Sequence, residues 1–329
     1  MVSLLGCLAL AGCGERTERF EGPTMGSRYS VQYLREAGAP APEQARQATE
    51  AILAEIDQQF STYRADSEVS HFNALPAGRC MALPAPMLEL VGFGERLSAE
   101  SDGAFDLTLE PLLDLWGFGP QARSQRVPSE AELAAALART GHRHLAVRDG
   151  QLCKDVDLKL DFNAIAAGYA VDRVSARLAE LGVRSSLVEI TGEMKARGRK
   201  ADGSPWRVAI EAPRDDEQQA QRIVALQDMA ISTSGDYRNY FLEGGRRYSH
   251  TLDPHSGAPI AHDLAAVTVL HPSALRADGL STLLLVLGPQ AGPAFAEAQG
   301  VAAFFVSRQG EGFVIHTSSR FRELVGADG

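Results

Sequence analysis

The stretch SLVEITGEMKARGRKADGSPWRVAIE, residues 186–211, indicates the fold class of this chain. Short apolar runs alternate with glycine-containing turns, which is typical of adjacent strands. The pattern predicts strands near 185–198 and 205–211, and further strands follow near 222–233, 239–250 and 264–270. Because helical patterns are grouped around these strands and do not alternate with them, we expect an α+β fold with a largely antiparallel sheet.

Helices are predicted where apolar residues recur at helical spacing. Residues 42–60 carry Ala45, Ala48, Ile52, Ile56 and Phe60 at that spacing. Ser129 and Glu132 form a capping-box pattern that opens a helix to about residue 139. Other helices and strands are predicted at 86–99, 164–181, 273–287 and 290–299 (helices) and at 29–34, 143–160, 301–307 and 312–317 (strands). Residues 101–127 lack periodicity and are expected to form a long loop, and no strand precedes a dinucleotide-binding glycine motif.

Composition limits the possible functions. The chain has 329 residues, 45% of them apolar, and a net charge of −10. This acidic balance argues against nucleic-acid binding, which needs a broad basic surface. It allows a phosphorylated small ligand, provided that backbone N–H groups, a few local cations or a metal ion hold the phosphates.

The N-terminus predicts an export signal. The apolar stretch from Val2 to Gly12 is shorter than the roughly 20 residues of a membrane span and is typical of a signal peptide. Leu10-Ala11-Gly12-Cys13 matches the cleavage site of bacterial lipoproteins. We therefore expect residues 1–13 to be the lipoprotein signal, with Cys13 lipidated, and the protein to be periplasmic and attached to a membrane, inner or outer, only through that anchor.

Two cysteines lie outside this leader, Cys80 and Cys153. In an oxidising compartment they could form a disulfide, but the sequence does not place their Cα atoms within bridging distance. Two buried free thiols are an equally good interpretation.

A first candidate site lies in the helix predicted at 273–287. Asp278, Ser281 and Thr282 are spaced i, i+3 and i+4, so they share one helix face. Their oxygens suit Mg²⁺ or Ca²⁺. The alternative is a solvated surface face, although the apolar run that follows Thr282 favours a buried helix, in which a carboxylate needs a cation or hydrogen-bond partners.

A second candidate is LDFNAIAAGYAVDRV, residues 160–174. Asp161 ends a strand and Asn163 is a possible helix cap. The small residues Ala164, Ala167 and Gly168 would let an anionic ligand approach the helix N-terminus. Tight packing of the helix against the sheet would explain the same small residues.

Two loop segments complete the candidates. Residues 101–120 combine acidic and aromatic side chains, which form either a ring-binding wall or a hydrophobic plug under the loop; the residues are Asp102, Phe105, Asp106, Trp116 and Phe118. In YSHTLDPHSG, residues 248–257, His250 is expected at a strand end next to an Asp253-Pro254 turn. A histidine there suits general-base catalysis near neutral pH, but it is more often structural.

Eight ordered segments resemble the ApbE family of FAD:protein FMN transferases, from about residue 20 to residue 315. The segments are TMGSRYSV (24–31), STYRADSEVSHFN (61–73), SDGAFDLTLEPLLDLWGFG (101–119), LDFNAIAAGYAVD (160–172), EITGEMKARG (189–198), SGDYRNYF (234–241), YSHTLDPHSGAPI (248–260) and ADGLST (277–282). The resemblance implies one domain over 14–329 with a T-fold-like α+β architecture.

The resemblance also implies an activity. Such proteins cleave the FAD diphosphate with Mg²⁺ and transfer FMN to a Thr or Ser hydroxyl of a partner protein, releasing AMP. The partners carry a Ser/Thr-Gly-Ala-Ser/Thr motif and include subunits of the Na⁺-translocating NADH:quinone reductase and of the Rnf complex. Two alternatives remain open, an FAD pyrophosphohydrolase that yields FMN and AMP and a non-enzymatic periplasmic flavin-binding lipoprotein.

Site residues follow from the resemblance by position. His250 corresponds to the histidine that activates the acceptor hydroxyl. The magnesium ligands are expected to be Asp278, Ser281, Thr282 and the carbonyl of Ala164. The FAD contacts are expected from Met25, Tyr63, Ala104, Phe105, Asp106, Asp161, Ala167 and Leu252. The chain departs from many relatives at Thr191-Gly192-Glu193, where they carry Gly-Gly-Asp, and at Ser281, where some carry Asp.

Overall fold

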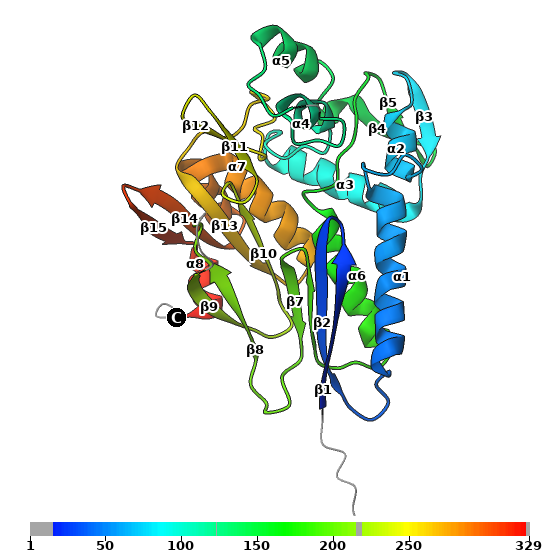
Figure 1. Ribbon diagram of the computed structural model, residues 1–329, viewed down its shortest axis with the longest axis vertical. Helices are drawn as coiled ribbons and strands as arrows, with labels where there is room; N and C mark the ends of the chain where they lie inside the picture. The colour runs from blue at the N-terminus through cyan, green and yellow to red at the C-terminus, as the bar shows by residue number, and fades with distance from the viewer. Residues whose placement is uncertain (1–15, 123, 215–218, 327–329) are drawn as a thin grey trace, which may run out of the picture.

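The centre of the molecule is one antiparallel sheet. The structure is a computed structural model that describes residues 16–122, 124–214 and 219–326. Within these residues the sheet has eight strands (Figure 1), and every neighbouring pair is antiparallel. Their spatial order is β1 (Arg16–Thr24), β2 (Ser27–Arg35), β6 (Ser186–Ile190), β7 (Glu193–Arg197), β10 (Ala230–Gly235), β13 (Leu264–His271), β14 (Ala302–Gln309) and β15 (Gly312–Thr317). The expected α+β class with an antiparallel sheet is confirmed.

The two faces of the sheet bury separate cores because side chains alternate along each strand. In β14, Ala303 and Phe305 face the larger core, whereas Phe304 and Val306 face the smaller one. The larger core lies under helices α1 (Pro42–Phe60), α3 (Ala85–Glu100), α6 (Ala166–Glu180) and α7 (Ala274–Ala298). The smaller core lies under α8 (Ser319–Val325) and the hairpin of β8 (Trp206–Glu211) and β9 (Ala220–Leu226).

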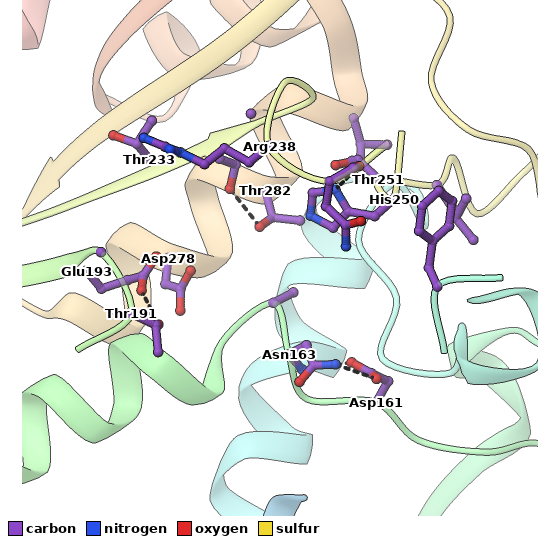
Figure 2. Close-up of a pocket in the computed structure, with 18 of the residues that line it drawn as sticks. Asp161, Asn163, Thr191, Glu193, Thr233, Arg238, His250, Thr251, Asp278 and Thr282 are labelled. Atoms are coloured by element: carbon purple, nitrogen blue, oxygen red, sulfur yellow. Dashed lines mark hydrogen bonds between the residues drawn. The ribbon is translucent and has the colours of Figure 1, made fainter. Parts of the chain in front are cut away.

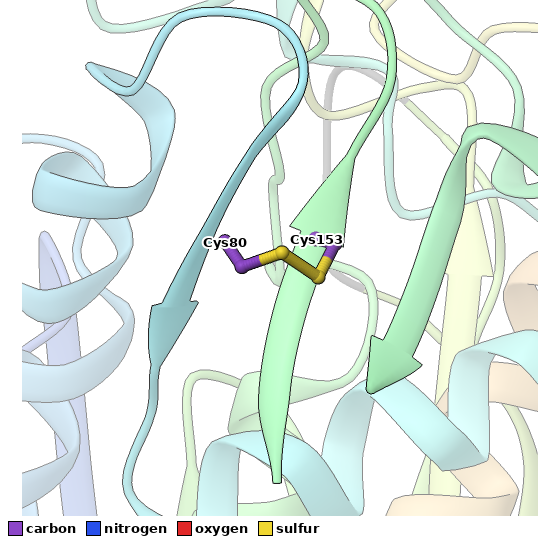
Figure 3. Close-up of a disulfide and its surroundings, with 2 residues drawn as sticks. All are labelled: Cys80 and Cys153. Carbon is purple, nitrogen blue, oxygen red and sulfur yellow. A yellow bond between two sulfur atoms is a disulfide. The ribbon is translucent and has the colours of Figure 1, made fainter. Parts of the chain in front are cut away.

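Shorter elements gather beyond one end of the main sheet, around α3 (Figure 1). They are α2 (Glu68–Asn73), α4 (Glu110–Trp116), α5 (Glu130–Leu137), the three-stranded sheet of β3 (Arg79–Ala82), β5 (Gln151–Lys154) and β4 (Leu145–Arg148), and the hairpin of β11 (Tyr240–Glu243) and β12 (Arg246–Ser249). Cys80 of β3 and Cys153 of β5 are directly paired and form a disulfide (Figure 3), which settles the choice left open by the sequence.

Local sequence explains several boundaries. Helix α1 spans the predicted residues, with Pro42 in its first turn. Ser129 and Glu132 form both hydrogen bonds of the capping box at the start of α5. Gly288, with φ of 76°, interrupts α7 where the two predicted helices meet. Helix α7 is long and apolar enough to cross a membrane, but it packs against β10 and β13 with half of its most apolar window buried, as expected of a core helix.

Some predicted elements were wrong. Residues 185–198 form the hairpin β6–β7 rather than one strand, because Thr191 and Gly192 take φ of 55° and 115° and reverse the chain. The predicted loop 101–127 contains α4. Asn163 does not cap α6, because its Nδ2 donates to Asp161 Oδ2 at 2.9 Å, and the N-cap residue is Ile165. The predicted signal and Cys13 lie outside the described residues.

Candidate functional site

A cavity of about 830 Å³ lies where the ends of β7 and β10, helix α7 and the shorter elements meet. It brings together residues from across most of the chain (Figure 2). Eleven of the predicted site residues line it: Met25, Tyr63, Ala104, Phe105, Asp106, Asp161, Ala164, His250, Leu252, Asp278 and Thr282. Ala167 and Ser281 do not line it, since Ala167 is buried in the first turn of α6 and Ser281 is buried behind the hydroxyl of Ser234.

Asp278 lines the side of the cavity that α7 and β10 form. Its side chain comes from the second turn of α7 and is only 5% exposed. Oδ2 accepts the backbone N–H of Gly168 at 2.8 Å, and Oδ1 accepts Ser232 Oγ at 3.4 Å. Burial raises its pKa well above the ordinary value, and the negative charge of Glu193 raises it further. The close packing of α6 on α7 explains why a glycine stands at position 168. The N–H group of Gly168 already donates to the carboxylate of Asp278.

Hydroxyl groups surround this carboxylate. Ser234 Oγ lies 2.9 Å from Ser281 Oγ and 3.0 Å from Thr282 Oγ1. Ser281 also lies 3.3 Å from Ser232 and donates to the carbonyl oxygen of Asp278. Two β10 serines thus link the predicted metal ligands of α7. In the described part of the chain, no three His, Cys, Asp or Glu side chains cluster as a metal site, so any cation here would be held by a mixture of carboxylates, hydroxyls and carbonyls.

Glu193 lines the cavity but is absent from the site residues that the sequence predicts. It begins β7, and Thr191 Oγ1 donates to its Oε2 at 2.8 Å. Burial raises the pKa of Glu193, while hydrogen bonds from Thr191 and Ser232 oppose that shift. Glu193 and Asp278 lie side by side in Figure 2, and the hydroxyl of Ser232, which donates to Asp278, also neighbours Glu193. The sequence could have indicated this residue through the turn Thr191-Gly192, which directly precedes it. The prediction of one continuous strand over 185–198 overlooked that turn.

His250 directly follows the end of β12, as the sequence predicts. It lies on the side of the cavity opposite Asp278 (Figure 2). Its Nδ1 lies 3.1 Å from the carbonyl oxygen of Asn239, which also accepts the His250 backbone N–H at 3.0 Å. Because a carbonyl can only accept, Nδ1 carries the proton and Nε2 keeps its lone pair. Burial lowers the pKa of His250, so the neutral ring predominates near neutral pH.

The residues around His250 hold its strand end in place. Tyr248 stacks on Phe241 and Trp116 at centroid distances of 5.1 and 5.6 Å. Trp116 Nε1 donates to Gly257 O, and so Trp116 fills the core under the loop. Asp253 accepts the N–H groups of His255 and Ser256, which confirms its role in the turn.

A third side of the cavity combines aromatic and apolar side chains. Tyr63 is 69% exposed, and Phe105, Phe118 and Met25 line the cavity with it. Asp106 is engaged by its own chain, because its oxygens accept Thr108 N, Thr108 Oγ1 and the N–H of His142. The side chain of Asp102 is absent from the lining. Residues 101–120 thus line the cavity through Phe105 and Phe118 and fill the core under the loop through Trp116, while the binding of a ring stays a prediction.

Asp161 lies on the loop before α6 and is 7% exposed. It accepts the N–H of Asn163 at 2.7 Å, and burial raises its pKa to about 6. The loop it shapes presents Ala164 to the same cavity as Asp278.

Comparison with known proteins shows the family of this chain. The ApbE family model matches residues 25–305. The chain belongs to the ApbE family. An ApbE relative from Vibrio cholerae, named FAD:protein FMN transferase, is 41% identical and aligns over 99% of this chain and 98% of its own length. The relative of the same name from Escherichia coli is 34% identical over 98% and 96%. These ApbE matches identify the protein as a transferase enzyme.

Solved ApbE structures share the fold. The flavinyl transferase ApbE of Pseudomonas stutzeri, in its apo form, is 62% identical, with a TM-score of 0.90 over 96% of this chain and 98% of that one. The ApbE protein of Thermotoga maritima is 28% identical, with a TM-score of 0.84 over 94% and 99%. The α+β architecture expected for an ApbE protein is therefore confirmed.

Proposed function

We propose that this protein transfers FMN from FAD to a Thr or Ser hydroxyl of an acceptor protein and releases AMP. One observation carries the proposal: the free Nε2 of His250 shares a cavity with the oxygen cluster of Asp278, Thr282 and Glu193. This arrangement pairs a neutral base with donors for a cation on opposite sides of a space large enough for a dinucleotide. The names of the ApbE relatives supply the substrate, FAD, and the group transferred, FMN.

His250 would act on the acceptor. As the acceptor oxygen attacks the FMN phosphorus, its proton passes to Nε2 of His250. A new P–O bond joins FMN to the acceptor, and the P–O bond to the AMP phosphate breaks, so that AMP leaves with the bridging oxygen and its electron pair. Asn239 O keeps the proton on Nδ1 throughout and so fixes the tautomer that can accept at Nε2.

The oxygen cluster fits a divalent cation such as Mg²⁺. Asp278 is buried and Glu193 is half-buried beside it, and the pKa values of both carboxylates are raised, so a cation would relieve their repulsion. Asp278, Glu193, Thr282 and the carbonyl of Ala164 would hold it. When bound, the cation supplies neutralisation of diphosphate charge, which a cavity with this many carboxylates otherwise lacks. Ser281 would support Thr282 through Ser234 rather than bind directly.

The flavin is assigned to the aromatic side of the cavity. Tyr63, Phe105 and Phe118 offer ring faces and edges to an isoalloxazine, and Met25 and Leu252 add apolar contact. Ala167 would contribute only to the position of the α6 N-terminus, since it does not reach the cavity.

The acceptor is proposed to be an extracytoplasmic protein carrying a Ser/Thr-Gly-Ala-Ser/Thr motif, such as a subunit of the Na⁺-translocating NADH:quinone reductase or of the Rnf complex. The Cys80–Cys153 disulfide supports this location, since disulfides persist in oxidising compartments. Lipidation at Cys13 would attach the enzyme to the membrane on that side.

The test combines the purified protein with FAD, Mg²⁺ and an acceptor domain bearing Thr-Gly-Ala-Thr. We expect a covalent FMN adduct on the acceptor by mass spectrometry and one AMP per adduct, both abolished by EDTA. Free FMN and AMP without an adduct would show hydrolysis instead, and FAD binding without AMP release would show a storage protein.

A further inference from the structure

Arg238 stands out among the charged residues of the cavity. Of the described residues that line it, Arg238 alone is a lysine or arginine. The same lining contains six acidic residues, which are Asp106, Asp161, Glu189, Glu193, Glu211 and Asp278. A cavity of this composition repels a diphosphate unless cations compensate, and the oxygen cluster on α7 would provide one on its own side only.

The guanidinium of Arg238 has two neighbours, the carboxylate of Glu211 and the side chain of Tyr237. Its Nη2 pairs with Glu211 Oε2, and the two side chains are 55% and 29% exposed. The guanidinium carbon lies 5.3 Å from the ring centroid of Tyr237. The Arg238 side of this pair is open to solvent, and ion pairs near the surface contribute little net stability, so we expect the exchange of Glu211 for another anion to cost little. The Tyr237 ring limits the positions of the guanidinium, which reduces the entropy lost on binding.

Arg238 belongs to the loop that holds His250. It immediately precedes Asn239, whose carbonyl oxygen accepts both N–H groups of His250. In Figure 2 the Arg238 side chain extends from this loop toward Thr233, on the side away from His250.

We propose that Arg238 is a substrate-binding residue whose guanidinium leaves Glu211 and binds a phosphate oxygen of the dinucleotide diphosphate. This inference rests on the proposed function for the identity of the substrate. The planar fork of arginine matches two phosphate oxygens and forms charge-assisted hydrogen bonds of the same kind as its pair with Glu211, so a doubly charged diphosphate group can replace that single carboxylate. Glu211 then acts as a resting partner that competes with the substrate.

Binding of three probes tests this assignment. ADP carries the diphosphate, FAD carries the diphosphate and the flavin, and riboflavin carries only the flavin. Each is titrated by calorimetry with Mg²⁺ into the wild-type protein, Arg238→Gln and Glu211→Gln. We expect Arg238→Gln to weaken ADP and FAD binding about tenfold or more and to leave riboflavin binding unchanged. Glu211→Gln removes the competing carboxylate and should tighten ADP binding.

Other outcomes overturn the assignment. If Arg238→Gln and Glu211→Gln weaken ADP binding equally, the ion pair is structural. The same holds if riboflavin binding falls together with ADP binding, or if ADP binding does not change. A wild-type protein that binds FAD but never labels the acceptor would refute the proposed transfer, while the comparison of ADP with riboflavin would still decide the role of Arg238.

Discussion

The carboxylate of Asp278 accepts the backbone N–H of Gly168 at 2.8 Å, which ties the second turn of α7 to the first turn of α6. The two residues are separated by 110 positions in the chain. The absence of a side chain at Gly168 permits this approach, because a Cβ there would meet the carbonyl oxygen of Ala274 and lie 2.7 Å from Asp278 Cβ. The geometry of the proposed cation site is therefore fixed by helix packing before any ligand binds.

Replacing this glycine should damage both stability and metal binding. In Gly168→Ala, the added methyl group pushes α7 away from α6, and overpacking of this kind costs about 1–3 kcal/mol of unfolding free energy. The displacement of Asp278 should also weaken Mn²⁺ binding, measured by electron paramagnetic resonance. Gly92→Ala in α3 is the control, since its Cβ meets only Arg96 Nη1 at 3.6 Å. Equal urea midpoints for the two variants would contradict the packing argument.

Glu193 offers a second test of the cation site. Glu193→Gln removes the half-buried carboxylate next to the buried Asp278, so the metal-free protein should become more stable and the affinity for Mn²⁺ should fall about 10–100-fold. Thermal unfolding with and without Mn²⁺ measures both effects. Glu189→Gln, which lines the same cavity, is the control and should change Mn²⁺ affinity less. A Glu193→Gln protein that keeps full Mn²⁺ affinity would remove this residue from the ligand set.

His250 should control the rate rather than substrate binding. Loss of a general base costs about 10²–10⁴-fold in rate, so His250→Ala should transfer FMN that much more slowly while its FAD affinity stays close to wild type. Burial lowers the pKa of His250 below its ordinary 6.5, so the base is already neutral at that pH. The rate should therefore fall on acidification with a midpoint below pH 6.5. A midpoint above pH 6.5 would assign the fall to another group.

The sequence predicted elements well where local physical chemistry decides them. The spacing of Ile52, Ile56 and Phe60 defines α1, and the capping box at Ser129 defines the start of α5. The sequence-based prediction failed where a two-residue turn reverses the chain at Thr191 and Gly192, because the positive φ of Thr191 is uncommon for a residue with a side chain. Strand order was also beyond local patterns, because β2 pairs with β6 across about 150 intervening residues and only tertiary packing decides that choice.

The candidate site divides in the same way. Asp278 and Thr282 could be paired from helical spacing, and His250 from its turn. Glu193 and Ser234 could not, since their contact with α7 depends on which strands neighbour β10. The resemblance to a family supplied the residues at Met25 and Tyr63, which no spacing argument links to the rest.

Glu110 should make stability depend on pH. It is 4% exposed, burial raises its pKa from 4.5 to about 7, and Asn73 Nδ2 donates to it at 2.6 Å. A carboxyl group with a raised folded pKa contributes its stability below its unfolded pKa and loses it as pH rises through the folded pKa. Glu110→Gln should therefore be more stable than wild type at pH 8 by about 1–3 kcal/mol, with a smaller difference at pH 4.5.

Urea unfolding at the two pH values measures this difference. Glu311→Gln, on the exposed turn between β14 and β15, is the control and should show no such change. If Glu110→Gln is less stable than wild type at pH 8, the weak pair with Lys159 at 3.5 Å matters more than burial.

The Cys80–Cys153 disulfide should stabilise the fold and, through β5, the side of the cavity that we propose binds the flavin. The bridge closes a loop over 73 positions, and disulfides of this kind typically contribute about 2–4 kcal/mol. Lys154, next to Cys153, donates to the carbonyl oxygens of Asn73 and Leu158, and the same Asn73 holds the backbone of Leu160, the residue before Asp161.

We therefore expect reduction, or the variant Cys80→Ser, to lower the urea midpoint and to weaken riboflavin binding more than Mn²⁺ binding. Cys80 is exposed, so its replacement breaks the bridge without opening a cavity in the core, whereas Cys153→Ser changes a buried position and should cost slightly more. Adding reductant to Cys80→Ser should have no further effect. If reductant shifts the midpoint of this variant as much as that of the wild type, the stabilisation does not come from the bridge.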